Sequence, residues 1–328
     1  MKNMSRPIHF LGLGIEWGQG LKGPAQAPDY FRRALKEGAS VPFKPHDLGQ
    51  VSHPDQSSHP KVHSHQDLAH MDLRAYRQGH QEISSFYSQT QMPWQKKTQA
   101  PSASPLLLNW GGDHSVALAT VGAFVDSYPD GKILWIDAHA DINTPESSPT
   151  GNLHGMPLSI LMSPPEERPA NLSWLKKRLL PDQLIYLGLR DLDPFEVEVI
   201  SKQGICTYDM DQVRRRGMSV IAREIFRQVG DQPLHISLDV DGLDPALAPA
   251  TGVKAQGGLW LSEVLDLAGP LSQCPHLKSI DIVEFNPLLG SPKEVGQTFA
   301  AALMALLAFI NESQFGEVTP LSQAGAFF

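Results

Sequence analysis

The sequence predicts an α/β fold in which a parallel sheet carries helices on both faces. Short apolar runs recur along the chain, and most are separated by stretches long enough for a helix, which is the pattern of strand and helix alternation. With 328 residues, of which 41% are hydrophobic, the chain can bury a sizeable core. Two of the runs end directly in carboxylates, and ligands of open α/β sheets gather at such strand ends.

The elements follow in chain order from this alternation. The expected strands are the apolar runs Ile8–Leu13, Leu106–Trp110, Ile133–Ile136, Leu184–Leu189, Leu234–Leu238 and Ile280–Val283. The expected covering helices are Pro28–Lys36, Glu196–Ile200, Val220–Val229 and Glu294–Ile310. Residues 50–66 are polar and His-rich, and residues 88–105 are rich in Gln, Ser, Pro and Lys, so both are predicted to be surface insertions. Without an internal repeat, residues 1–328 are expected to form one domain.

Composition excludes several classes of partner. The net charge is -8, and the largest basic cluster is Arg214–Arg216, so a nucleic acid is not expected to bind. Cys206 and Cys274 are too few for a disulfide framework, and no apolar leader precedes Glu16, which favours a reducing cytoplasm. The longest apolar run, Phe299–Ile310, has 12 residues where a membrane span needs about 20, so it is predicted to be a buried helix.

Two short motifs carry most of the chemistry. They are Asp137-Ala-His139-Ala-Asp141 and Asp239-Val-Asp241, each placed directly after an expected strand. Because residues i, i+2 and i+4 of a strand share a face, the side chains within each motif are expected to converge. Carboxylates beside buried strands are costly unless they are paired or bind a cation.

Together with His114, the two motifs supply two imidazoles and four carboxylates, which is too many ligands for one ion. Hard oxygen donors with a minority of nitrogens suit Mn²⁺ or Mg²⁺. Two bridged ions about 3.5–4 Å apart would activate a shared hydroxide. We therefore expect a hydrolytic binuclear site.

Simpler explanations exist for single members of this set. Asp137, Asp239 and Asp241 could cap helices, since Asp is favoured at helix N-termini. Asp141 could be a structural carboxylate bonded to backbone amides, and His114 alone could be a hydrogen-bonded core histidine. The position of His139 between two aspartates favours the metal site over these alternatives.

The order of longer motifs resembles the ureohydrolase family, and its arginase branch in particular. The resemblance covers roughly residues 105 to 310, with a weaker match at residues 22–28. Its motifs are Gly111-Gly-Asp-His-Ser115, Asp137-Ala-His-Ala-Asp-Ile-Asn143, Thr150-Gly-Asn-Leu-His-Gly155, Gly188-Leu-Arg-Asp-Leu-Asp193, Ser237-Leu-Asp-Val-Asp-Gly-Leu-Asp-Pro245, Ala248-Pro-Ala-Thr-Gly252 and Glu284-Phe-Asn-Pro287. The resemblance implies an arginase-like sheet of about eight parallel strands.

The resemblance also implies an enzyme that hydrolyses L-arginine to L-ornithine and urea. The six residues would bind two Mn²⁺ per subunit, and Asp141 would also take a proton from the hydroxide that bridges the metals. That hydroxide attacks the guanidinium carbon. Glu284 would pair with the guanidinium, which needs a carboxylate, and His154 would shuttle protons. Glu284 could instead be a solvated rim residue, and His154 a purely structural histidine.

By the same resemblance, the amino-acid end of the substrate is held by separate residues. Asn143, Thr150 and Asn152 match positions that bind the α-carboxylate, and Asp193 matches one that contacts the α-amino group. Turn formation would also explain the first three, and Asp193 could cap the helix that follows it. Val253 replaces a Thr that is usual at the guanidinium end of the site.

Other functions stay open at this point. The chain could hydrolyse agmatine or another guanidino acid, or it could bind metal without turnover. The family resemblance implies a homo-oligomer, a trimer or a hexamer, although Ser262 replaces an Arg that supports the trimer of familiar members. The histidines upstream of the motifs could suggest a second metal site, but their polar neighbours favour a solvated loop; they are His53, His59, His63, His65, His70 and His80.

Overall fold

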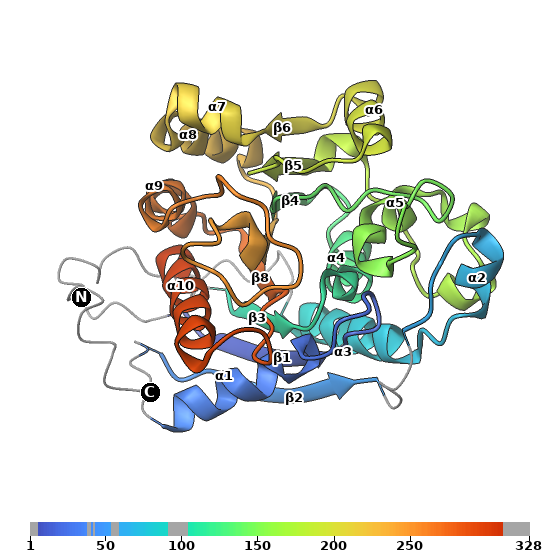
Figure 1. Ribbon diagram of the computed structural model, residues 1–328, viewed down its shortest axis with the longest axis horizontal. Coiled ribbons are helices and arrows are strands. Elements are labelled where there is room, and N and C mark those ends of the chain that lie inside the picture. The colour runs from blue at the N-terminus through green and yellow to red at the C-terminus, as the bar shows by residue number, and fades with distance from the viewer. Residues whose placement is uncertain (1–5, 38–40, 42, 54–58, 91–103, 311–328) are drawn as a thin grey trace, which may run out of the picture.

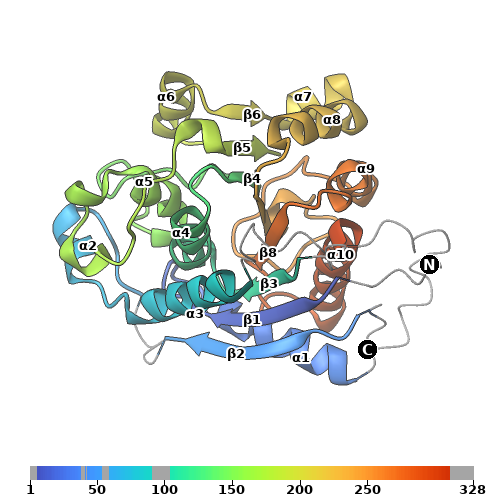
Figure 2. The ribbon, with the colours of Figure 1, turned by 180° about the vertical axis from the view of Figure 1, so that it is seen from behind.

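The computed structural model describes residues 6–37, 41, 43–53, 59–90 and 104–310, which form a sheet with helices on both faces (Figures 1 and 2). The strand order is β2-β1-β3-β8-β7-β4-β5-β6, and every pairing in this eight-stranded sheet is parallel. The central strands are therefore β3, β8, β7 and β4. This architecture confirms the predicted fold class.

The strands are β1 (Ile8–Gly14), β2 (His46–Ser52), β3 (Leu106–Gly111), β4 (Lys132–Ile136), β5 (Leu184–Leu187), β6 (Cys206–Tyr208), β7 (Leu234–Asp239) and β8 (Leu277–Val283). The α-helices are α1 (Ala27–Lys36), α2 (His65–His70), α3 (Arg74–Thr90), α4 (Ala117–Ser127), α5 (Pro157–Met162), α6 (Pro194–Gln203), α7 (Met210–Arg216), α8 (Met218–Val229), α9 (Leu261–Ser272) and α10 (Pro292–Ile310). Of the short 3-10 helices, η2 (His114–Val116), η3 (Leu153–Gly155) and η7 (Val240–Gly242) lie near the site.

The sheet separates two hydrophobic cores. On one face α1 and α7–α10 pack against alternate strand residues such as Leu108 and Leu238, and on the other α3, α4 and α5 pack against residues such as Leu107 and Trp135 (Figure 1). This division follows from strand geometry, since successive side chains point to opposite faces. Burial on both faces explains why the central strands are nearly continuous apolar runs.

The six predicted strands are confirmed, and two more strands flank them. β2 and β6 are the two edges of the sheet. In β2 only Val51 is buried, and β6 has three residues, so neither produces a long apolar run in the sequence. The four predicted helices, α1, α6, α8 and α10, are confirmed with longer bounds, whereas the other six α-helices were not predicted: α2, α3, α4, α5, α7 and α9.

Part of the predicted 50–66 insertion belongs to the folded body. Val51 and Val62 are buried in the core beside α3, and His53 is buried and stacks on Trp17 with ring centroids 3.6 Å apart. His80 is likewise buried, in α3. The prediction of a solvated loop is therefore wrong for His53 and His80. Of the second predicted insertion, residues 88–90 end α3, and residues 91–103 lie outside the described residues.

Helix α10 is longer than the apolar run that predicted it. Its 19 residues would be long and apolar enough to cross a membrane, but 67% of its apolar window is buried inside the fold. The helix packs on α9 and on the sheet through residues such as Phe299, Ala302 and Leu306 (Figure 1). This packing is that of a core helix.

A buried polar network lies within the central strands. His235 of β7 places Nε2 3.2 Å from Asp281 Oδ2 of β8 and Nδ1 2.7 Å from Ser279 Oγ. Asn109 Nδ2 donates to Asp281 Oδ1 at 2.7 Å, and the Tyr87 hydroxyl contacts Ser279 Oγ at 2.7 Å. Each of these five residues is at most 1% exposed. The network satisfies part of these buried polar groups, while Asn109 Oδ1, His235 Nε2 and Asp281 Oδ2 make no hydrogen bond with the described residues.

We expect Asp281→Ala to destabilise the fold, because it leaves His235 and Asn109 buried without their partner. Removing one member of a buried pair commonly costs about 3–5 kcal/mol. The free energy of unfolding in denaturant measures this loss. Glu198→Ala, which breaks the exposed pair with Lys202 on α6, is the control and should cost less than about 1 kcal/mol. Equal effects of the two changes would contradict the stabilising role of the network.

Candidate metal centre

The predicted site residues meet at the carboxyl ends of the four central strands. β3 leads to His114 in η2, and β4 leads to Asp137. β7 ends at Asp239 and is followed by Asp241 in η7, while Glu284 follows β8. These four strands are neighbours in the sheet, in the order β3-β8-β7-β4, so the loops that follow them lie side by side at its middle, where open α/β folds bind ligands.

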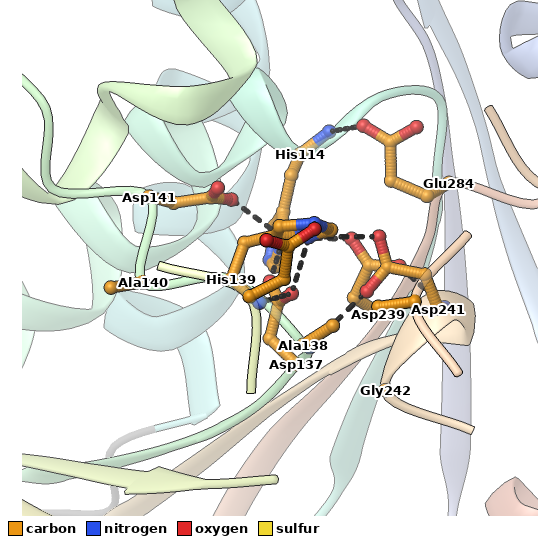
Figure 3. Close-up of polar contacts among 12 residues, drawn as sticks. His114, Asp137, Ala138, His139, Ala140, Asp141, Asp239, Asp241, Gly242 and Glu284 are labelled. Carbon is orange, nitrogen blue, oxygen red and sulfur yellow. Dashed lines mark hydrogen bonds and ion pairs between the residues drawn. The ribbon is translucent and has the colours of Figure 1, made fainter. Parts of the chain in front are cut away.

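His114 lies at the centre of a first group of carboxylates. Its Nδ1 atom is 3.0 Å from Asp137 Oδ2, 3.1 Å from Asp141 Oδ2 and 3.2 Å from Asp239 Oδ2. The imidazole is 1% exposed. Figure 3 shows these carboxylates directed toward the ring.

A second group forms around His139 and shares Asp137 with the first. His139 Nδ1 is 3.2 Å from Asp241 Oδ2 and 3.4 Å from Asp137 Oδ1. Asp137 therefore offers one carboxylate oxygen to each group. The ligand atoms of His114, Asp137 and Asp141, and those of Asp137, His139 and Asp241, each lie within 4.8 Å of one another. All six predicted residues are thus brought together (Figure 3).

The expectation that a strand aligns Asp137, His139 and Asp141 is wrong. β4 ends at Ile136, and residues 137–141 form an irregular turn. The His139 amide donates to Asp137 Oδ1 at 2.7 Å, and Asp141 adopts a left-handed backbone with φ 51°. As a result the His139 side chain lies beside Asp241, whereas the Asp141 side chain lies beside His114. The motif therefore contributes side chains to both groups instead of aligning them on one face of a strand.

Asp239 combines the two roles that the sequence left open. Its Oδ1 atom accepts a hydrogen bond from the Asp241 amide at 2.7 Å, so it caps η7. Its other oxygen faces His114. A carboxylate has enough acceptor positions to cap a helix and to face the site at the same time.

The site concentrates negative charge in a buried place. Burial and the neighbouring Asp137 raise the pKa of Asp241 to about 7. Burial and Asp137 also raise the pKa of Asp141, and burial with Asp241 and Asp137 raises that of Asp239 well above its usual value. The carboxylates thus destabilise one another's charged forms. Added positive charge between them would relieve this repulsion.

The donor set fits divalent cations. His114 Nδ1 is buried and makes no hydrogen bond with any described residue, although three carboxylate oxygens face it. Four carboxylates and two imidazoles without a thiol are suited to hard or borderline ions. Cys206 on the edge strand β6 and Cys274 after α9 are both free thiols outside the two groups.

Two positioning residues escaped the sequence analysis. Ser237 Oγ is 2.9 Å from His114 Nε2, which leaves Nδ1 to face the carboxylates. Trp135 stacks on the His114 ring at 3.9 Å and donates from Nε1 to Asp137 Oδ2 at 3.0 Å. Both precede a site aspartate by two residues on a strand. The two-residue period of strands was the signal that could have identified them.

Glu284 lies above the two groups and is held by three donors. Its Oε1 accepts from the His114 amide at 2.8 Å and lies 3.0 Å from His154 Nδ1, and its Oε2 accepts from Gln19 Nε2 at 2.5 Å. Its backbone is left-handed, with φ 64°. A carboxylate has roughly four acceptor positions, so capacity for one further donor is left. Gln19 is 265 residues distant in sequence, and no motif pointed to it.

His154 and Glu284 stabilise each other's charged forms. Burial alone lowers the pKa of His154, but the contact with Glu284 raises it to about 9. Burial would raise the pKa of Glu284, yet the bond from His154 lowers it overall. At neutral pH His154 therefore carries a proton beside an ionised Glu284.

The predicted substrate residues, which we call the rim residues, lie in the loop after Asp141 and at the start of α6, and these two segments meet at Asn143 and Asp193. Asn143 Nδ2 donates to Asp193 Oδ2 at 2.8 Å, and Ser147 Oγ donates to Asn143 Oδ1 at 2.8 Å. The Asn152 amide donates to Thr150 Oγ1 at 3.2 Å. Asp193 also begins α6, where its amide donates to Glu196 Oε2 at 3.0 Å. Its carboxylate nevertheless faces Asn143, so the capping position does not remove it from the rim.

Comparisons with known proteins agree with this arrangement. The sequence matches the arginase family over residues 6–309. It is 32% identical over 320 residues to the hepatic arginase of Aquarana catesbeiana, which covers 95% of this chain and 94% of that protein. It is 40% identical over 196 residues to an arginase of Schizosaccharomyces pombe, which covers 59% of this chain but only 61% of that relative's length.

A similar structure supports the same assignment. The arginase of Entamoeba histolytica, solved in complex with L-ornithine, has a TM-score of 0.76 to this chain at 26% identity, covering 95% of this chain and 99% of that one. The match to the family spans nearly all of the described sheet and includes every residue of the two metal-binding groups. This chain therefore belongs to the arginase family.

Proposed function

We propose that this protein hydrolyses L-arginine to L-ornithine and urea at a binuclear manganese site. The observation that carries the proposal is the pair of ligand groups that share Asp137 below Glu284. One carboxylate common to two groups is what a pair of adjacent ions needs. Membership of the arginase family supports a binuclear centre and this reaction class.

The proposed ligands divide between the two positions. His114, Asp141 and Asp239 would hold one ion and His139 and Asp241 the other, while Asp137 would contact both. When bound, two such ions supply a water whose pKa is low enough to give hydroxide at neutral pH. We propose Mn²⁺ because the donors are mainly carboxylates with a minority of imidazoles.

The other side chains bind the guanidinium and move protons. The ionised Glu284 has acceptor capacity left for a planar cationic group, which it would orient above the ligand groups. Asp141, whose pKa burial and Asp137 raise, would accept the proton of the attacking water. The protonated His154 contacts Glu284 at 3.0 Å, so it is placed to give a proton to the departing amine.

The rim residues would bind the amino-acid end of the substrate. Asp193 is an anionic partner for the α-ammonium group, and Asn143, Thr150 and Asn152 offer polar groups to the α-carboxylate. The 2.8 Å bond between Asn143 and Asp193 supports this arrangement, because it places the two recognition elements next to each other. A substrate without these two groups would not need them.

We also propose where the protein is located, how it is divided into domains and how it assembles. Two free thiols support a reducing, cytoplasmic location. The continuous eight-stranded sheet supports a single domain over residues 1–328. Exposed apolar side chains on α8 and near α9, Val220, Phe226, Trp260 and Leu265, support a homo-oligomer such as a trimer or hexamer.

Removal of metal should abolish urea release from arginine. We expect Mn²⁺ to restore the activity of the chelated enzyme better than Zn²⁺, because the site has no thiolate and is rich in carboxylates. A colorimetric urea assay after chelation and reconstitution, with the metal content measured in the same samples, tests this. Full activity in metal-free protein would contradict the proposed mechanism.

Asp141→Asn should lower kcat by about 100-fold or more, which is typical of a lost general base. Asparagine tolerates the left-handed backbone at this position, so the fold should be preserved. Steady-state kinetics at a measured metal content separate lost proton transfer from lost metal. Asp182→Asn, which changes an exposed carboxylate, is the control. Near-normal turnover of the Asp141 variant with both metals bound would exclude the proton-accepting role.

The substrate range should depend on Asp193. Arginine should be hydrolysed with a kcat/KM at least about tenfold above that for agmatine, because agmatine lacks the carboxylate that Asn143, Thr150 and Asn152 would bind. Asp193→Asn should lower kcat/KM for arginine about tenfold or more, with little effect on 5-guanidinopentanoate, which has no α-amino group.

Asp209→Asn is the matched control for this variant, since Asp209 caps α7 away from the site. A helix-capping role alone would affect both guanidino substrates equally. Efficient agmatine hydrolysis by the unaltered enzyme would assign the chain to a different substrate within the family.

A further inference from the structure

The His-rich segment upstream of α2 packs against the proposed substrate loop. We define the clamp segment as residues 61–65 and the substrate loop as residues 143–152. The Val62 amide of the clamp segment donates to the Gly151 carbonyl at 2.8 Å, and the Val62 side chain is fully buried. At the other end, His65 Nδ1 contacts Glu146 Oε1 at 2.7 Å. The two segments are thus joined at both ends.

Gly151 shows how close this packing is. It has a left-handed backbone, φ +66°, and a Cβ atom there would lie 2.6 Å from the His63 ring. Only glycine fits both conditions without strain. The His63 amide in turn donates to Asp67 Oδ2 at 3.0 Å, which ties the clamp segment to the first turn of α2. The segment is therefore fixed at its own end as well as to the substrate loop.

This packing places the side chain of Lys61 on the substrate loop. Lys61 Nζ donates to Asn152 Oδ1, one of the three proposed carboxylate-binding positions. Lys61 is exposed, and no carboxylate of the described residues lies within ion-pair distance of it. Its charge is therefore available to a ligand.

The charges around the substrate loop favour a cation as a partner for a carboxylate. The Asn143 amide already donates to Asp193 and accepts from Ser147, so one of its two N–H groups is left for a carboxylate. Thr150 and Asn152 are neutral. Without Lys61, a substrate carboxylate would approach neutral groups beside the anionic Asp193, which repels it. Hydrogen bonds from a charged donor are roughly twice as strong as neutral ones.

We propose that Lys61 is a specificity-determining residue that donates to the α-carboxylate of the substrate, and that the clamp segment holds it in place. The inference rests on the proposed function of the substrate loop. In the free protein Asn152 accepts the lysine hydrogen bond. The ammonium has three donors, so a carboxylate can be added without loss of this bond.

The test compares ligands that differ only in the carboxylate. We would measure KM and kcat for L-arginine and agmatine, and by calorimetry the dissociation constants of L-ornithine and 1,4-diaminobutane. Lys61→Met keeps the length and apolar stem but removes the charge. It should raise KM for arginine and the dissociation constant of ornithine about tenfold or more, which is the effect of one lost charged hydrogen bond. The kcat for both substrates, KM for agmatine and the dissociation constant of 1,4-diaminobutane should stay nearly unchanged.

Two further variants control for structural effects. Lys61→Arg should restore most of the preference for carboxylate-bearing ligands, and Lys202→Met, which alters an exposed lysine on α6, should change neither ligand pair. If Lys61→Met weakened the binding of both ligands of each pair equally, or of neither, the proposed role of Lys61 in specificity would be overturned.

The unaltered enzyme separates this inference from the proposed function. If it already hydrolysed agmatine as well as arginine, the carboxylate-binding role of the whole substrate loop would fail, and the role of Lys61 with it. If it preferred arginine and Lys61→Met kept that preference, only the role of Lys61 would fail.

Discussion

Four buried carboxylates lie close together with the buried His114 and the half-buried His139 at the carboxyl end of the sheet, and the rest of the structure has to accommodate their charges. Carboxylates packed this closely raise one another's pKa values, as at Asp241, whose pKa rises to about 7. The two histidines and several backbone amides offset part of the repulsion. The turns after three central strands supply such amides: after β3 His114 donates to Glu284, after β4 Ala138 donates to Asp241, and after β7 Asp241 donates to Asp239. Metal ions between the ligands would complete the neutralisation.

Two residues adopt backbones that side chains other than glycine seldom take. Asp141 and Glu284 both have positive φ, which typically costs of the order of 1–3 kcal/mol each. Both are held there by neighbours: Glu284 by three hydrogen bonds, and the chain around Asp141 by the bond from the Leu158 amide to its carbonyl at 3.1 Å. The strain directs Asp141 to His114 and Glu284 over the ligand groups. It therefore coincides with the residues to which we assign proton transfer and substrate binding.

The site also depends on segments that are distant in sequence. Gln19 comes from the loop after β1, yet it donates to Glu284 from the loop after β8. Lys61 comes from the segment before α2 and reaches the substrate loop after β4. Loops after the central strands provide the ligands, whereas these two segments contact Glu284 and the substrate loop.

The amino-acid sequence was enough to predict the α/β class, six of the eight strands and the six side chains of the two metal groups. These features leave local signals: the apolar runs of strands buried on both faces, and polar residues placed where such strands end. The sharing of Asp137 by both groups became visible only in the folded structure. A turn after Ile136 directs His139 and Asp141 to different groups. Such a turn follows local backbone hydrogen bonds, which no residue period encodes. The same holds for Gln19 and Lys61, whose contacts arise only when the sheet brings separate loops together.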